Sequence, residues 1–182
     1  LYADNPNSLQ IKEIEKRVYQ FFKKLKLPNT PTIYDYLVLS LRPRDLIATF
    51  NWDPFLYQAW NRNHDIADRP YIAFLHGNVA MGYSEIDKRC GPAGMYAKET
   101  NNYMHPTKLL CPVTQKNDNS DKCISSQWDM FKDFLSDKNV RRITVFGYGA
   151  PDTDVEAMEI MLDAWGGGKV RDLENFEVID VR

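Results

Sequence analysis

The chain has 182 residues, the length of one domain or of a domain with a small inserted module. Its 23 basic and 25 acidic residues leave a formal charge of −2, which gives no electrostatic case for nucleic acid as a partner. Because no apolar run approaches the roughly 20 residues needed to span a bilayer, we also expect no membrane partner.

Hydrophobic spacing in the first part of the chain predicts helices and strands in alternation. We expect helices over about 8–27, 32–41 and 54–62, and strands over 45–50 and 71–75. This alternation is typical of proteins in which helices cover the faces of a parallel sheet.

Periodicity fails from 78 to about 119, where glycine and proline are frequent. A loop this long is uncommon in a compact domain, so we expect an irregular insert there, either an added module or a mobile lid. Regular patterns resume with a helix over 125–135, a strand over 142–146, a helix over 154–165 and a strand over 176–181. We therefore predict an α/β fold in one domain: a Rossmann-like parallel sheet with flanking helices and an irregular insert.

The chain has three cysteines at wide spacing, Cys90, Cys111 and Cys123. An odd number at this spacing argues against a disulfide framework, and zinc sites prefer close cysteine pairs. The first residues also lack the basic and then apolar pattern of a signal peptide. We therefore expect reduced thiols, no metal site and a cytoplasmic protein.

Hydrogen-bonding residues follow three of the predicted strands at the points where they end. Asn51 and Asp53 follow the first strand, His76 follows the second, and a glycine turn over 147–149 follows the third. In α/β sheets ligands bind at the carboxyl ends of the strands. The three strand ends therefore predict one site built by convergence.

The segments at these strand ends resemble, in order, the motifs of the sirtuin-like family of NAD-consuming enzymes. They read Thr49-Phe50-Asn51-Trp52-Asp53, then Leu75-His76-Gly77, then Gly147-Tyr148-Gly149 followed by Pro151 and Asp154. The resemblance covers about 45–182 and is closest to the bacterial branch often found in defence proteins.

The resemblance implies a role for each matched position. His76 would be the general base, and Asn51 and Asp53 would hold the nicotinamide ribose with its amide or a water. The remaining matched positions would line the NAD site: Gly77, Gly147, Tyr148 and Gly149. These residue types suit the chemistry, because histidine can take a proton at neutral pH and glycine lets a ligand approach the backbone closely.

The function implied is binding of NAD and its cleavage to nicotinamide and an ADP-ribose product. The chain would be the effector domain of a larger bacterial defence-type protein, with other domains or subunits as partners. Two alternatives stay open: a catalytically degenerate module for nucleotide sensing or oligomerisation, and an NAD-dependent protein deacylase. The family's glycine-rich loop, which binds the pyrophosphate, has no counterpart here and would precede residue 1, so we expect the chain to be incomplete at its N-terminus.

Structural roles are also open for the same residues. Asp53 is placed to cap the helix that follows it, and Asp152 and Asp154 to cap the last helix. His76 can be a structural hydrogen-bonding residue, and the glycine turn an ordinary connection between strand and helix.

Overall fold

The computed structural model of the chain describes residues 9–66, 68–110, 121–149, 154–166 and 175–179. Its first part contains the five elements expected from the sequence. They are α1 (Leu9–Phe22), α2 (Ile33–Ser40), β1 (Leu46–Thr49), α3 (Phe55–Arg62) and β2 (Tyr71–Phe74). The structure is thus of mixed α/β type, as predicted.

Helix α1 ends about five residues earlier than the predicted end at residue 27. The side-chain amide of Gln58 in α3 explains the difference, because it binds the backbone beyond the helix at two points. Gln58 Nε2 donates to Leu25 O at 2.9 Å, and Leu27 N donates to Gln58 Oε1 at 2.8 Å. A distant side chain therefore takes up the backbone groups of Leu25 and Leu27, a contact that their own spacing does not show.

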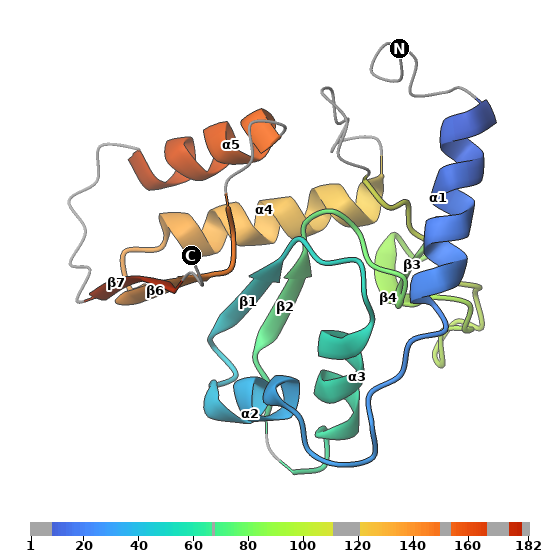
Figure 1. Cartoon of the computed structure of the whole chain (residues 1–182), viewed down its shortest axis with the longest axis horizontal. Helices are drawn as coiled ribbons and strands as arrows, with labels where there is room; N and C mark the ends of the chain where they lie inside the picture. The colour runs from blue at the N-terminus through green and yellow to red at the C-terminus, as the bar shows by residue number, and fades with distance from the viewer. Residues whose placement is uncertain (1–8, 67, 111–120, 150–153, 167–174, 180–182) are drawn as a thin grey trace.

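The pair β1 and β2 forms a short parallel sheet with helices on both faces (Figure 1). Side chains alternate strictly between the two faces. One face packs toward α4 (Lys122–Ser136) and presents Leu46, Ala48, Phe50, Ala73 and Leu75; the other packs toward α2 and α3 and presents Ile47, Ile72 and Phe74. Burial on both faces explains why these strands read as continuous apolar runs in the sequence.

A second parallel pair forms from β6 (Arg142–Phe146) and β7 (Asn175–Ile179). Along the chain, α5 (Val155–Gly166) lies between these two strands. Among the described residues, no hydrogen-bonded ladder joins β6 to β1 or β2. The four expected strands are therefore present as two parallel pairs among the described residues. Helix α4 packs on both β1 and β2 and also on α5, so it spans the region between the two pairs (Figure 1).

The segment expected to be irregular contains a small antiparallel sheet in its described part. Its strands are β3 (Met81–Ser84), β4 (Arg89–Pro92) and β5 (His105–Pro106), in the order β4-β3-β5. The prediction was wrong in this respect, because strands of two to four residues that contain Gly82, Gly91 and Pro92 show no readable alternation.

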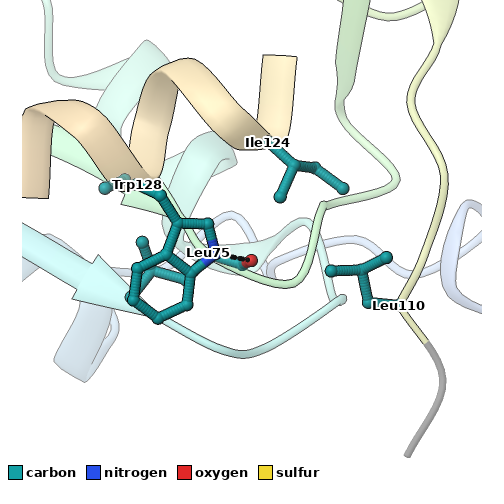
Figure 2. Packing of buried hydrophobic residues seen from close by; sticks show 5 residues of the cluster. Leu75, Leu110, Ile124 and Trp128 are labelled. Carbon is teal, nitrogen blue, oxygen red and sulfur yellow. Dashed lines mark hydrogen bonds between the residues drawn. The ribbon is translucent and has the colours of Figure 1, made fainter. Parts of the chain in front are cut away.

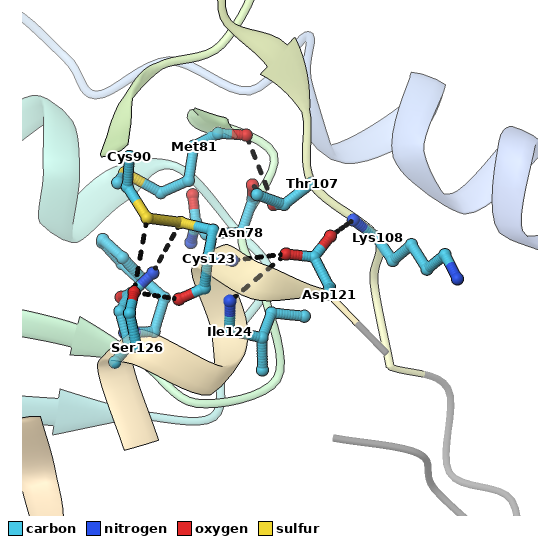
Figure 3. Close-up of a disulfide and its surroundings, with 11 residues drawn as sticks. Asn78, Met81, Cys90, Thr107, Lys108, Asp121, Cys123, Ile124 and Ser126 are labelled. Atoms are coloured by element: carbon cyan, nitrogen blue, oxygen red, sulfur yellow. Dashed lines mark hydrogen bonds between the residues drawn. A yellow bond between two sulfur atoms is a disulfide. The ribbon is translucent and has the colours of Figure 1, made fainter. Parts of the chain in front are cut away.

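Two of the three cysteines form a disulfide, Cys90–Cys123, with their Cα atoms 5.6 Å apart (Figure 3). The expectation of reduced, unpaired thiols was therefore wrong for these two residues. Their separation of 33 positions hides the contact, which arises when β4 folds onto the first turn of α4. Cys111 lies outside the described residues.

Candidate functional site

The backbone at the end of β2 is held from several sides where His76 begins the turn. Leu75 O accepts a hydrogen bond from Trp128 Nε1 in α4 at 2.9 Å, within the buried cluster shown in Figure 2. His76 O accepts one from Leu110 N at 2.9 Å. These contacts fix the backbone of His76 more firmly than a free loop would.

Gly77 has a structural requirement of its own. Its φ angle is +77°, and a Cβ atom there would stand 2.1 Å from Lys108 O. Only glycine permits this close approach of the two backbone segments. The sequence predicts that Gly77 lines the NAD site. In the structure, the backbone of Lys108 occupies the space next to its Cα.

The His76 ring lies in a buried, aromatic setting. The residue is 6% exposed, and its ring makes an edge contact with Phe50 at a centroid distance of 4.7 Å. On its polar side, His76 Nε2 lies 3.9 Å from Asp154 Oδ1, and the side chains of both residues are less than one tenth exposed. An imidazole and a carboxylate buried at this distance are groups that general acid–base catalysis uses.

Tyr148 joins this cluster from the end of β6. Its ring stacks on Phe50 with centroids 4.6 Å apart and planes 15° apart, and its hydroxyl donates to Asp154 Oδ2 at 3.5 Å. Burial, together with the nearby Asp154 carboxylate, raises the pKa of Tyr148 to about 12. Tyr148 is therefore a neutral hydrogen-bond donor throughout the physiological range.

Asp154 is the residue of this cluster that the sequence interpretation missed as a functional candidate. It directly precedes α5, so its position also matches the expected cap. Its carboxylate faces His76 and Tyr148, which come from other segments. The only signal in the sequence was its place at the end of the glycine turn; Asp152 lies outside the described residues.

The two flanking glycines of the turn leave room on this side of the molecule. Gly147 has φ of +61°, and a Cβ built there would meet no heavy atom within 4 Å. Gly149 is exposed as well. Unlike Gly77, Gly147 therefore offers open backbone that a ligand can approach.

Asn51 and Asp53 lie in the loop after β1. Asn51 is exposed, and its backbone N donates to Thr49 Oγ1 at 3.1 Å. Asp53 Oδ1 accepts a hydrogen bond from Phe55 N, the first residue of α3, at 3.0 Å. The N-cap position of α3 is occupied by Pro54, one residue later than predicted.

A second residue missed from the sequence, Asn78, connects this loop to the His76 turn. It is fully buried, and its Nδ2 donates to Asn51 O at 3.1 Å and to Asp53 O at 2.6 Å. Its Oδ1 accepts from Ala80 N at 2.9 Å. Asn78 thus satisfies both ends of its amide while fixing the loop of Asn51 relative to His76.

Trp52, between Asn51 and Asp53, carries a buried polar atom without a partner. Its ring packs edge-on against Phe22 of α1 at 6.1 Å. Its Nε1 is buried and, within the described residues, forms no hydrogen bond. Unpaired buried N–H groups are uncommon in folded proteins.

Comparison of the chain with protein-family models, with curated proteins and with solved structures finds no match. Within the residues that the structure describes, no group of three or more His, Cys, Asp or Glu side chains is arranged to hold a metal ion. Nor does any described helix have the length and apolar character needed to cross a membrane.

Proposed function

We propose that the chain binds NAD and cleaves it to nicotinamide and an ADP-ribose product. The observation that carries the proposal is the convergence of His76, Asp154 and Tyr148 around Phe50. These residues come from the ends of β1, β2 and β6, where α/β proteins bind ligands. The same convergence supports a Rossmann-like arrangement of the two parallel pairs.

The cluster fits the chemistry of glycosidic bond cleavage. As the bond between nicotinamide and C1′ of the ribose breaks, positive charge develops on the ribose, and a water or ribose hydroxyl must lose a proton. His76 would take that proton, and the Asp154 carboxylate would stabilise the resulting imidazolium. In hydrolysis the water oxygen then bonds to C1′, nicotinamide leaves, and one proton is released per NAD.

The loop residues would position the substrate. The exposed amide of Asn51 is available to the ribose or the attacking water, and the open backbone at Gly147 to the adenosine half. Asn78 would keep these groups in register with His76. As the resemblance implies, the chain would act as part of a larger defence-type assembly.

The binding-module alternative is supported by a different observation. Two of the expected ligand residues have structural tasks: Gly77 accommodates Lys108 O, and Asp53 accepts a hydrogen bond from the first backbone amide of α3. If Gly77 and Asp53 serve folding alone, the chain would keep these residues of the sirtuin-like motifs without cleaving NAD. Such a module would bind a nucleotide or mediate assembly without consuming NAD.

Nicotinamide release by variants distinguishes the two. His76→Ala should lower turnover by about two to four decades, the usual contribution of a general acid or base. Asn51→Ala should also reduce turnover, through lost positioning. His64 is the matched control, because its exposed ring bonds only to neighbouring residues of its own turn at Asn61 O and Asp65. Full activity of His76→Ala would remove the proposed mechanism. No nicotinamide release by the unsubstituted protein would favour the binding module.

A further inference from the structure

The disulfide Cys90–Cys123 joins two elements that are 33 residues apart in the sequence. Cys90 lies in β4 of the small antiparallel sheet, and Cys123 is the second residue of α4 (Figure 3). The Cα separation of 5.6 Å is in the usual range for a disulfide. The bond therefore fastens the inserted sheet to the helix that covers β1 and β2.

The two sulfur atoms differ in access. Cys123 is fully buried, whereas Cys90 is partly exposed and its Sγ lies 3.6 Å from Ser126 Oγ. Gln127 Nε2 donates to Cys123 Sγ at 3.2 Å, and Cys123 lies in the first turn of α4. An amide donor and a helix N-terminus both stabilise a sulfur that carries negative charge. An external thiolate would therefore attack Cys90 Sγ, and Cys123 would depart as the thiolate.

The surroundings of the disulfide contact the His76 turn directly. The same Gln127 accepts a hydrogen bond from Phe74 N at 2.5 Å, two residues before His76. Asp121, which caps α4 at Cys123 N, also accepts from Lys108 N at 3.1 Å, and the carbonyl of Lys108 faces Gly77. Both hydrogen-bonded routes from the disulfide thus end on the backbone that flanks His76.

We propose that Cys90–Cys123 is a reversible redox site reduced by a dithiol, and that its oxidised form holds the His76 turn in place. In reduction, one thiolate of the dithiol bonds to Cys90 Sγ and the Sγ–Sγ bond breaks. The second thiolate then displaces Cys90, so the dithiol becomes a disulfide and the chain gains two thiols and two protons. Redox regulation of NAD cleavage rests on the proposed function. Redox control of the conformation of the His76 turn does not.

Amide hydrogen exchange of the oxidised and dithiothreitol-reduced protein tests the proposal without any activity. Under native conditions, reduction should release two thiols per chain. It should also speed exchange at the hydrogen-bonded amides of Gly77, Val79 and Ala80 and in the β3–β4 hairpin by about tenfold or more. Cys90→Ser should show the fast pattern under both conditions. Cys111→Ser is the matched control and should respond as the unsubstituted chain does.

Thiols that appear only in denaturant, or equal exchange in the two forms, would overturn the proposal. Nicotinamide release measured on the same samples separates it from the proposed function. If both hold, reduction should slow release by roughly fivefold or more, a typical coupling between two sites. Changed exchange with no release in either form would refute NAD cleavage and leave the redox control of the turn standing.

Discussion

Asp154 and His76 show how a local pattern can hide a functional pair. In the sequence Asp154 reads as a helix cap, because caps are defined by their immediate neighbours. In the structure its carboxylate also lies 3.9 Å from His76 Nε2, across 78 positions of the chain. The tertiary contact, which no local pattern encodes, gives the histidine a charged neighbour in a buried site.

Asp154→Asn tests whether that charge assists His76. At about 4 Å, one charge is worth between about 1 and 4 kcal/mol at effective dielectric constants of 80 and 20. We therefore expect nicotinamide release to fall by roughly fivefold to several-hundredfold.

Tyr148→Phe separates the charge of Asp154 from its hydrogen bond, because it removes the hydroxyl that bonds to the carboxylate but keeps the ring and the charge. It should lower nicotinamide release by less than Asp154→Asn does. Equal release by Asp154→Asn and by the unsubstituted protein would show that the carboxylate has no electrostatic role at His76.

Gly77 and Gly147 both have positive φ but face different surroundings, which permits a matched comparison. Gly77→Ala should lower the free energy of unfolding by about 2 to 5 kcal/mol, because a strained φ is combined with overlap at Lys108 O. Gly147→Ala should cost only about 1 to 2 kcal/mol, since its Cβ would enter open space. Urea denaturation measures both, and equal losses would contradict the assigned role of Gly77.

At the scale of elements, the paired helices α2 and α3 are joined by one charged contact. Asp35, 4% exposed on α2, accepts hydrogen bonds from Arg62 and Asn63 of α3 and from Thr32 N at its own helix start. The Arg62 guanidinium is the largest influence that holds the pKa of Asp35 well below its usual range. This contact fixes how α2 and α3 pack under the β1–β2 pair.

Acid denaturation of Asp35→Asn checks this contact. Because the folded-state pKa of Asp35 lies below its unfolded value of about 3.9, its contribution is fully present above that pH and is lost as the pH falls below it. The substitution should cost about 1 to 3 kcal/mol at pH 7, and it should flatten the loss of stability below about pH 4. We expect the lower part of this range because the Arg62 side chain keeps 31% exposure.

Glu13→Gln is the control, since it removes an exposed pair with Arg17 on α1. It should leave the free energy of unfolding unchanged at pH 7. Equal effects of the two substitutions would show that Asp35 is no more than a surface charge.

The sequence predicted the helices and the strands β1, β2, β6 and β7 because each has its own periodicity or apolar run. It failed for β3, β4 and β5, whose residues give no alternating pattern, and for the disulfide, whose partners meet only after folding. It placed the start of α4 three residues late, at Ser125 instead of Lys122.

The candidate site divides in the same way. His76, Asn51 and Tyr148 are at strand ends, and strand ends can be read from the sequence. Asn78 and Asp154 could not be assigned, because their partners lie in other segments: Asn51 O and Asp53 O for Asn78, and His76 for Asp154. Trp52 is ordinary in sequence and stands out only through its buried, unpaired Nε1.

At the scale of the whole molecule, residues that follow strands of both parallel pairs contact one another at one place. Phe50 extends from β1, contacts His76 beyond β2 and stacks on Tyr148 beyond β6. Helix α4 supports this arrangement from one side through Trp128 and Gln127, which bind the backbone of Leu75 and Phe74. The site therefore depends on the packing of the whole chain and not on any single motif.

A mass balance of NAD incubated with the unsubstituted protein tests the central claim most directly. Chromatography should recover one nicotinamide and one ADP-ribose product for each NAD lost, at a rate proportional to the amount of protein. Recovery of all the NAD intact, with no nicotinamide formed, would contradict the account and assign the cluster of His76, Asp154 and Tyr148 to binding or to structure alone.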